Sequence, residues 1–161
     1  MVGNRESVRL WKYDYSLEGG YFVTICTFER ACVFGEIVNG VMRLNIFGES
    51  VFQIWQTLPS HFPSLILDEF VVMPNHLHGI ITFNRRGPRL GQVVGYFKYQ
   101  STKMINELRN VSPVRFWQRN YHEHVIRDEK DLERIREYIF NNPLQWHLDQ
   151  ENPRRGGVPP P

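Results

Sequence analysis

Residues 65–83, LILDEFVVMPNHLHGIITF, decide the fold of this chain. Two runs of β-forming apolar residues, 65–73 and 77–83, are separated by Pro74-Asn75. Proline cannot donate a hydrogen bond to a neighbouring strand, so this pair predicts a break or bulge between two strands. His76 and His78 lie at that junction. Residues at positions i and i+2 of a strand point to the same face, so the two imidazoles can converge on one divalent metal as neutral ligands.

The sequence on either side of this segment supplies the remaining elements. Asn39-Gly40 predicts a tight hairpin turn within residues 32–44. Apolar residues at helical spacing predict amphipathic helices over 45–59 and 90–108, and residues 21–28 and 121–126 have the composition of strands. Asp128 is a candidate N-cap of a last helix, which Asn141-Asn142-Pro143 ends. This order of elements predicts an α+β fold, with helices packed on an antiparallel sheet.

Length and composition indicate one domain. The 161 residues are 42% hydrophobic, which is enough for a normal core, and we assign residues 1–150 to it. Residues 151–161 are rich in Pro, Gly and Arg and are expected to form a disordered tail. The net charge of +2 does not by itself predict a nucleic-acid partner. Two cysteines, no signal peptide and no apolar run of membrane length predict a cytoplasmic protein without a membrane partner.

A tyrosine in the last predicted helix is the candidate nucleophile. Tyr138 and Asn142 are four residues apart and therefore share a helix face. Two imidazoles, one amide oxygen and phosphate oxygens together would suit Mg²⁺ or Mn²⁺. A tyrosine near such an ion could attack a phosphodiester and form a covalent phosphotyrosine. The pattern predicts cleavage and rejoining of DNA strands by a single tyrosine.

The residues alone leave alternatives open. His122 and His124 form a second pair at i and i+2, and Tyr121 beside them is a rival nucleophile. A pair of histidines also occurs in satisfied cores and in structural zinc sites, although such zinc sites usually have four protein ligands. A small metal-dependent hydrolase that uses water would need the same histidines and would leave no covalent adduct.

Three segments of the chain resemble the REP-associated tyrosine transposases, a bacterial branch of the HUH single-tyrosine transposases. They are VVMPNHLH at 71–78, FWQRNYHEHVIR at 116–127 and EYIFNNP at 137–143. The basic and aromatic opening arm and Gly19-Gly20 match as well, so the resemblance extends to about Trp146. The hairpin around Asn39-Gly40 and the short tail depart from the family pattern.

The resemblance implies a ferredoxin-like antiparallel sheet and action on single-stranded DNA that bears hairpins. It implies His76 and His78 as metal ligands, Asn142 as the third ligand, and Tyr138 as the nucleophile of a 5′-phosphotyrosine intermediate, with Mg²⁺ or Mn²⁺ as cofactor. It favours this histidine pair over the second one and places His124 and Arg127 in a motif near the site. The alternative is a catalytically idle hairpin-binding protein of the same fold. Either would act as a monomer or a homodimer.

DNA contacts are expected from basic and aromatic side chains outside the metal motif. Aromatic residues of the opening arm can stack on bases, and cationic residues can contact phosphates. The expected DNA-binding residues are Arg9, Trp11, Lys12, Tyr13, Tyr15, Lys98, Lys103, Arg119 and Arg127. The basic loop that contains Arg85, Arg86 and Arg89 is the next candidate.

Overall fold

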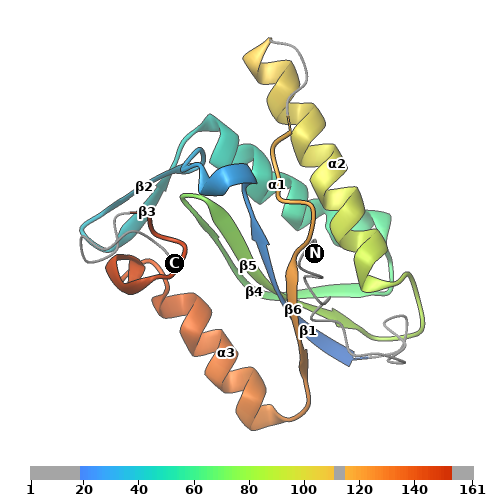
Figure 1. Cartoon of the computed structure of the whole chain (residues 1–161). Coiled ribbons are helices and arrows are strands. Elements are labelled where there is room, and N and C mark those ends of the chain that lie inside the picture. The colour runs from blue at the N-terminus through green and yellow to red at the C-terminus, as the bar shows by residue number, and fades with distance from the viewer. Residues whose placement is uncertain (1–18, 111–114, 154–161) are drawn as a thin grey trace, which may run out of the picture.

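The computed structural model describes residues 19–110 and 115–153, and its centre is a four-stranded antiparallel sheet (Figure 1). The strands lie in the order β4 (Leu65–Met73), β5 (His76–Phe83), β1 (Gly19–Cys26) and β6 (His122–Ile126). Helix α1 (Ile46–His61) precedes β4, and helix α2 (Leu90–Arg109) joins β5 to β6. This succession of strands and helices, with β1 inserted between β5 and β6, is the ferredoxin-like topology. The predicted fold class is confirmed.

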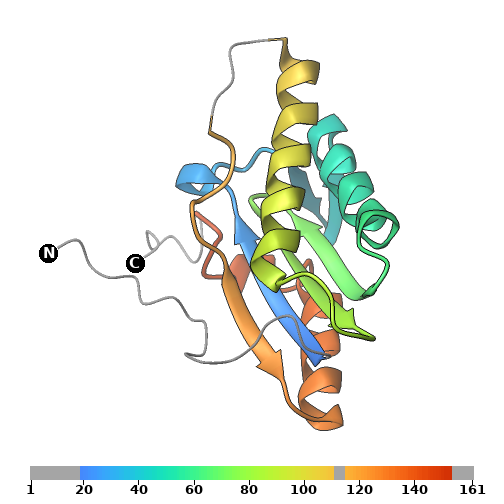
Figure 2. The same cartoon turned by 90° about the vertical axis from the view of Figure 1, so that its right-hand side faces the viewer.

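Different helices cover the two faces of the sheet (Figure 1, Figure 2). On one face, α1 and α2 lie side by side over the main core, to which they contribute Trp55 and Phe97. On the other face, helix α3 (Glu129–Asn141) covers a smaller cluster formed by Ile80, Ile135 and Ile139. Because side chains alternate along a strand, β5 serves both clusters and is buried on both faces.

A glycine in β5 lets α1 approach the sheet closely. A Cβ atom on Gly79 would lie only 2.4 Å from Cζ2 of Trp55, which is fully buried. The indole ring therefore occupies the space that any larger residue at position 79 would need.

The predicted helix starts are confirmed by their caps. Oδ1 of Asn45 accepts hydrogen bonds from the backbone N–H groups of Phe47 and Gly48, at 3.0 and 2.9 Å, where α1 begins. Oδ1 of Asp128 accepts from the N–H of Asp131 at 2.8 Å, where α3 begins. Both side chains satisfy backbone donors that the first turn of a helix leaves unpaired.

The predicted hairpin is also confirmed. Strands β2 (Gly35–Val38) and β3 (Val41–Leu44) form a separate two-stranded sheet. The turn residues Asn39 and Gly40 have φ angles of 50° and 75°, the positive values that a tight two-residue turn requires.

A bidentate ion pair fixes α3 to the edge of the sheet. Nε and Nη2 of Arg136 donate to the two carboxylate oxygens of Asp68, at 2.8 and 2.6 Å. Asp68 lies in β4 where the register with β5 shifts, between Leu67 and Phe70. This contact sets the position of α3, and therefore of Tyr138, relative to β5.

Two short 3₁₀ turns complete the described chain, at Phe28–Arg30 and at Trp146–Leu148. Across residues 19–110 and 115–153, no helix combines the length and the apolar character that a membrane span requires.

Candidate active site

The register of the sheet gathers polar side chains on the face that α3 covers. Thr24 of β1 is paired with His78 of β5 on one side and with His122 of β6 on the other. One row further along, Cys26 is paired with His76. Paired residues point to the same face of a sheet, so these side chains lie on the same side of the sheet as α3.

The histidine pair is buried and its Nε2 atoms converge. His76 and His78 are 0% and 4% exposed, and their Nε2 atoms are 3.0 Å apart. Nitrogens bound at right angles to one ion, each at roughly 2.1 Å, would be separated by about this distance. The pair is therefore spaced as two adjacent ligands of a single metal ion.

Asn75 determines which nitrogen of His76 is free to bind. Its Nδ2 donates to the carbonyl oxygens of Arg30 and Glu151, at 3.2 and 2.6 Å, which fixes the orientation of the amide. Its Oδ1 then lies 2.8 Å from Nδ1 of His76 and can only accept a hydrogen bond. The imidazole proton must be on Nδ1, so Nε2 of His76 presents a lone pair.

Thr24 makes the corresponding contact to His78. Its Oγ1 is 2.8 Å from Nδ1 of His78, and a hydroxyl can either donate or accept there. When Thr24 accepts, the proton of His78 is on Nδ1 and its Nε2 also presents a lone pair. Partners of this kind orient metal-binding histidines and fix their tautomers.

Burial keeps both imidazoles neutral. It lowers the pKa of His78 to about 3. It also lowers the pKa of His76 well below the ordinary value, and the neighbouring His78 adds to that effect. Neutral imidazoles are the form that binds metal.

Tyr138 and Asn142 of α3 lie next to the histidine pair. The ring centroid of Tyr138 is 5.4 Å from that of His78. The amide of Asn142 lies close enough to His76 and to the Tyr138 hydroxyl to act on the pKa of each. The side-chain oxygen Oδ1 of Asn142 is buried, and no hydrogen bond to it is found within the described residues. A buried oxygen of this kind is available to bind a cation.

The Tyr138 hydroxyl is held in its protonated form. Burial raises its pKa above 10, the ordinary value, and the charge of Asp149 raises it further. The Asn142 amide lowers this pKa, but burial and the Asp149 charge have larger effects. A nearby positive charge would therefore make the phenol a better nucleophile.

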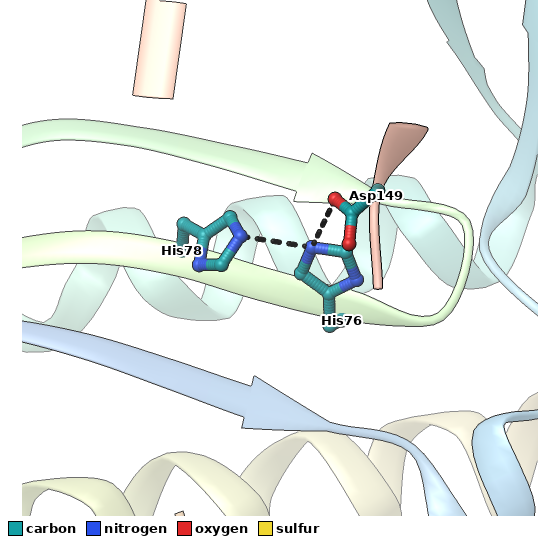
Figure 3. Close-up of side chains that lie close together, drawn as sticks. All are labelled: His76, His78 and Asp149. Atoms are coloured by element: carbon teal, nitrogen blue, oxygen red, sulfur yellow. Dashed lines mark hydrogen bonds and ion pairs between the residues drawn. The ribbon is translucent and has the colours of Figure 1, made fainter. Parts of the chain in front are cut away.

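The chain that follows α3 brings a carboxylate to the histidines (Figure 3). Oδ2 of Asp149 is 3.7 Å from Nε2 of His76. Potential ligand atoms of His76, His78 and Asp149 all lie within 4.8 Å of one another. Glu151 fixes this segment through its contact with Asn75 and an ion pair with Arg30, at 3.3 Å. The donor set of imidazole nitrogens, an amide oxygen and a carboxylate fits a divalent ion.

One pocket joins these groups. His78, Tyr138 and Asn142 line it beside Asp149 and Glu151, and His122, His124 and Arg134 line it as well. The pocket therefore has carboxylates among its lining residues near the histidine pair, and a guanidinium and further imidazoles elsewhere along its wall.

The structure brings together the predicted metal and nucleophile residues, and it places three of the predicted DNA-binding residues in a separate groove. Lys98, Lys103 and Arg119 line a groove between α2 and residues 115–119, away from α3. Nζ of Lys98 donates to the carbonyl oxygens of residues 118–120, at 2.8 to 3.3 Å, and so holds that segment in place. Arg127 is exposed between β6 and α3. The arm residues Arg9, Trp11, Lys12, Tyr13 and Tyr15 lie outside the described residues.

The alternative histidine pair has different surroundings. His122 and His124 are exposed on β6, and Nε2 of His124 is bound to Oδ2 of Asp131 at 2.6 Å. Tyr121 packs against the main core under α1 and α2, whereas Tyr138 lies on α3 over the other face.

Sequence reasoning missed Thr24, Asn75, Asp149 and Arg134. Asn75 directly precedes His76, so its contact with the ring could have been anticipated from the PNHLH segment. The other three residues carry no motif, and only the strand register and the turn after α3 bring them to the pocket.

Comparison with known proteins identifies the family of this chain. A family model described as "Transposase IS200 like" matches residues 44–142. An uncharacterized protein of Haemophilus influenzae is 41% identical over 170 residues, which cover 92% of this chain and 93% of that protein. The chain belongs to the IS200-like transposase family.

Two further similarities concern REP-associated enzymes. A protein of Haemophilus influenzae named "Putative REP-associated tyrosine transposase" is 24% identical over 143 residues, which cover 84% of this chain and 76% of that protein. The solved structure of a REP-associated tyrosine transposase bound to a REP hairpin matches with a TM-score of 0.64 at 19% identity, and covers 86% of this chain and 74% of that one. The structural similarity shows that the fold is shared.

Proposed function

We propose that this protein is a transposase that cleaves and rejoins single-stranded DNA next to hairpins through a 5′-phosphotyrosine on Tyr138, with Mg²⁺ or Mn²⁺ as cofactor. One observation carries the proposal: Tyr138, Asn142 and His78 line a single pocket, and Nε2 of His76 lies directly behind, 3.0 Å from Nε2 of His78.

The metal would be held by His76 and His78 through Nε2, with Asn142 and Asp149 as the oxygen donors nearest to them. Asn75 keeps the proton of His76 on Nδ1, and Thr24 can accept an Nδ1 proton from His78, in which case both Nε2 lone pairs are available. When bound, a divalent ion neutralises charge on a phosphate and orients it for attack.

The reaction exchanges one phosphoester bond for another. Oη of Tyr138 forms a bond to phosphorus while the bond from phosphorus to the 3′ oxygen breaks, and the released 3′-hydroxyl gains the proton that the phenol loses. Because the phosphoester is conserved, a 3′-hydroxyl can attack the tyrosyl linkage in the reverse sense and join strands without ATP.

The substrate assignment is supported by the family and by the fold. A protein of this fold has been seen bound to a REP hairpin. We propose the same class of partner here, with the opening arm as the contact to single-stranded bases, and Lys103, Arg119 and Arg127 as contacts to the DNA backbone.

Substitution of the nucleophile tests the proposal. The full chain is incubated in Mn²⁺ with single-stranded DNA that carries a hairpin and a label at its 3′ end, because the 5′-phosphotyrosine adduct retains the 3′ fragment, and the protein is separated on a denaturing gel. We expect a covalent protein–DNA band for the wild type and none for Tyr138→Phe, whereas Tyr121→Phe retains it. Cleavage without any covalent band would instead indicate a water-using hydrolase.

The Asp149 carboxylate, which lines the same pocket as Tyr138, favours a second candidate, an idle protein that only binds hairpins. A phenol held in its protonated form next to a carboxylate attacks slowly unless a cation offsets that charge. Hairpin binding by the wild type with neither cleavage nor adduct, at saturating Mn²⁺, would favour this second function.

A further inference from the structure

We infer that Arg134, His122 and His124 form a phosphate subsite that holds the backbone of single-stranded DNA beside the scissile phosphate. The inference rests on the proposed function, because it assigns a second contact within the same pocket. It gives His122 and His124 a task other than metal binding.

Arg134 is placed on the same face of α3 as the nucleophile. It precedes Tyr138 by one helical turn, and both side chains line the pocket. Its side chain is 69% exposed. A guanidinium has five N–H donors in a planar fork that matches phosphate oxygens. Within the part of the chain that the structure describes, Arg134 forms one hydrogen bond, to Asp131.

Asp131 fixes this guanidinium next to β6. Its Oδ1 accepts from Nη2 of Arg134 at 2.6 Å, and its Oδ2 is 2.6 Å from Nε2 of His124. One carboxylate thus ties a donor on α3 to an imidazole on β6, across the wall of the pocket. A side chain positioned in this way loses less freedom when it binds a ligand than a free surface arginine does.

The imidazoles of β6 extend this wall. His122 shares a row of the sheet with Thr24 and His78, and His124 lies in the next row, beside Phe22. No hydrogen bond of His122 is found within residues 19–110 and 115–153, so both of its ring nitrogens are available. A strand of DNA that places one phosphate at His76 and His78 would extend along this row toward β6.

The charges of the pocket differ between its two parts. Asp149 and Glu151 lie near the histidine pair, so a phosphate approaches there only when a cation is present. Arg134 can bind a phosphate without any metal. The subsite should therefore account for some of the DNA affinity that remains when divalent ions are removed.

A binding experiment on a non-cleaving protein tests this assignment. The full chain with Tyr138→Phe is titrated with a fluorescein-labelled oligothymidylate, in EDTA and in Mg²⁺, at several salt concentrations. We expect Arg134→Ala to weaken binding about tenfold under both conditions. It should also lower the slope of log affinity against log salt by about 0.7, the value for one lost phosphate contact on a single strand.

Three control variants separate the subsite from general charge effects. Lys130→Ala removes an exposed cation from the same helix, outside the pocket, and should leave affinity and slope nearly unchanged. His76→Ala should abolish only the increase in affinity that Mg²⁺ produces. Arg134→Lys keeps the charge but not the planar fork, so it should restore the salt slope and only part of the affinity.

The double variant Asp131→Asn with Arg134→Ala has the same net charge as the parent protein. We expect it to bind as weakly as Arg134→Ala. Restored affinity would show that the uncovered Asp131 carboxylate had caused the loss, and would overturn the assignment. Equal binding by Arg134→Ala and Lys130→Ala would overturn it as well. If the wild type forms no covalent adduct but Arg134→Ala still weakens binding, the proposed reaction fails and the subsite stands.

Discussion

At the scale of single residues, the hydrogen-bond partners of the histidines decide whether the pair can hold a metal. The Asn75 amide oxygen accepts a hydrogen bond from Nδ1–H of His76, so Nε2 of this ring carries no proton. The 3.0 Å contact between the two Nε2 atoms then requires either a proton on His78 Nε2 or a cation between them. Thr24 allows both, because its hydroxyl can donate to His78 Nδ1 in the first case and accept from it in the second.

Thr24→Val should therefore weaken metal binding. The valine cannot accept the Nδ1 proton that His78 carries when Nε2 binds an ion, and this nitrogen would be buried without a partner. We expect the affinity for Mn²⁺ to fall about 10- to 100-fold. Isothermal titration calorimetry measures the change, and Thr24→Ser, which retains the hydroxyl, should bind nearly as well as the wild type. Equal affinity for the Val and Ser variants would contradict the importance of this hydroxyl.

Asp149→Asn tests the acidic side of the site. The substitution keeps the shape of the side chain and removes its charge 3.7 Å from His76. If the carboxylate takes part in holding the ion, the affinity for Mn²⁺ should fall at least about tenfold, as for Asn142→Ala. Gln150→Ala, in the same turn, is the control. An unchanged Kd for Asp149→Asn, with a weaker one for Asn142→Ala, would exclude Asp149 from the ligand set.

The sequence predicted the residues of this site that lie within short motifs. His76 and His78 are two positions apart in one strand, and Tyr138 and Asn142 are one turn apart in one helix, so local geometry alone placed each pair. Thr24 reaches His78 only through the pairing of β1 with β5. The turns after α3 place Asp149 next to His76, and this segment has neither a periodic pattern nor a motif from which the contact could be predicted.

At the scale of elements, the ion pair between Asp68 and Arg136 fixes α3 to β4. The hydrogen bonds from Arg136 lower the pKa of Asp68 below 3.8, its ordinary value. A carboxyl with a lowered folded-state pKa binds fewer protons in the folded state, so its contribution to stability is present above pH 4 and is lost as the pH falls through the lowered pKa.

Asp68→Asn should therefore lower the urea midpoint of unfolding at pH 7, and this difference from the wild type should shrink as the pH approaches 3. Because the pair is partly exposed, salt should reduce the effect. Glu133→Gln, which alters the more exposed partner of Arg136, is the control and should have a smaller effect. A difference between Asp68→Asn and the wild type that is independent of pH would show that charge is not its cause.

Two glycines should respond to the same substitution in opposite directions. Gly79→Ala would place a Cβ atom 2.4 Å from the Trp55 ring and should destabilise the protein by about 1–3 kcal/mol. Gly95→Ala in α2 meets no atom within 4 Å and should stabilise it by roughly 0.5–1 kcal/mol, because alanine favours the helix. Urea denaturation measures both. Equal stability of the two variants would contradict the close approach of α1 to β5.

The elements themselves were largely predictable, because each has a local signal. The turn at Asn39-Gly40, the helix start at Asn45, the cap Asp128 and the apolar stripe of α3 all agree with the predictions from the sequence. The order of strands in the sheet has no local signal. The resemblance to a known family predicted this order, and the pairing of β1 with both β5 and β6 confirms the prediction.

At the scale of the whole molecule, the strand register shows which residues lie at the two ends of the sheet. His76 and Cys26 lie at one end of the central strands, and Gly19 is paired with Phe83 at the other. Gly20 is paired with Ile126 at this second end, so the opening arm joins the sheet next to Arg127 and to the loop that contains Arg85. A strand rises about 3.3 Å per residue, so Gly19 lies roughly 17 Å from Thr24 along β1. The proposed hairpin recognition by the arm and the proposed cleavage at Tyr138 would thus use different ends of one sheet.

Deletion of residues 1–18 should therefore impair recognition without disturbing the chemistry of the site. Stacking of an aromatic side chain on a base contributes roughly 1–3 kcal/mol, so loss of the arm that contains Trp11, Tyr13 and Tyr15 should weaken hairpin binding strongly and reduce its sequence preference. Affinity for Mn²⁺ and the covalent adduct on Tyr138 at saturating DNA should both persist. Fluorescence anisotropy with matched and scrambled hairpins measures the recognition, and a variant with Arg9 and Lys12 replaced by alanine isolates the phosphate contacts through the salt slope. Unchanged affinity and preference after the deletion would place recognition on the described surface instead, with the loop of Arg85, Arg86 and Arg89 as the first region to test.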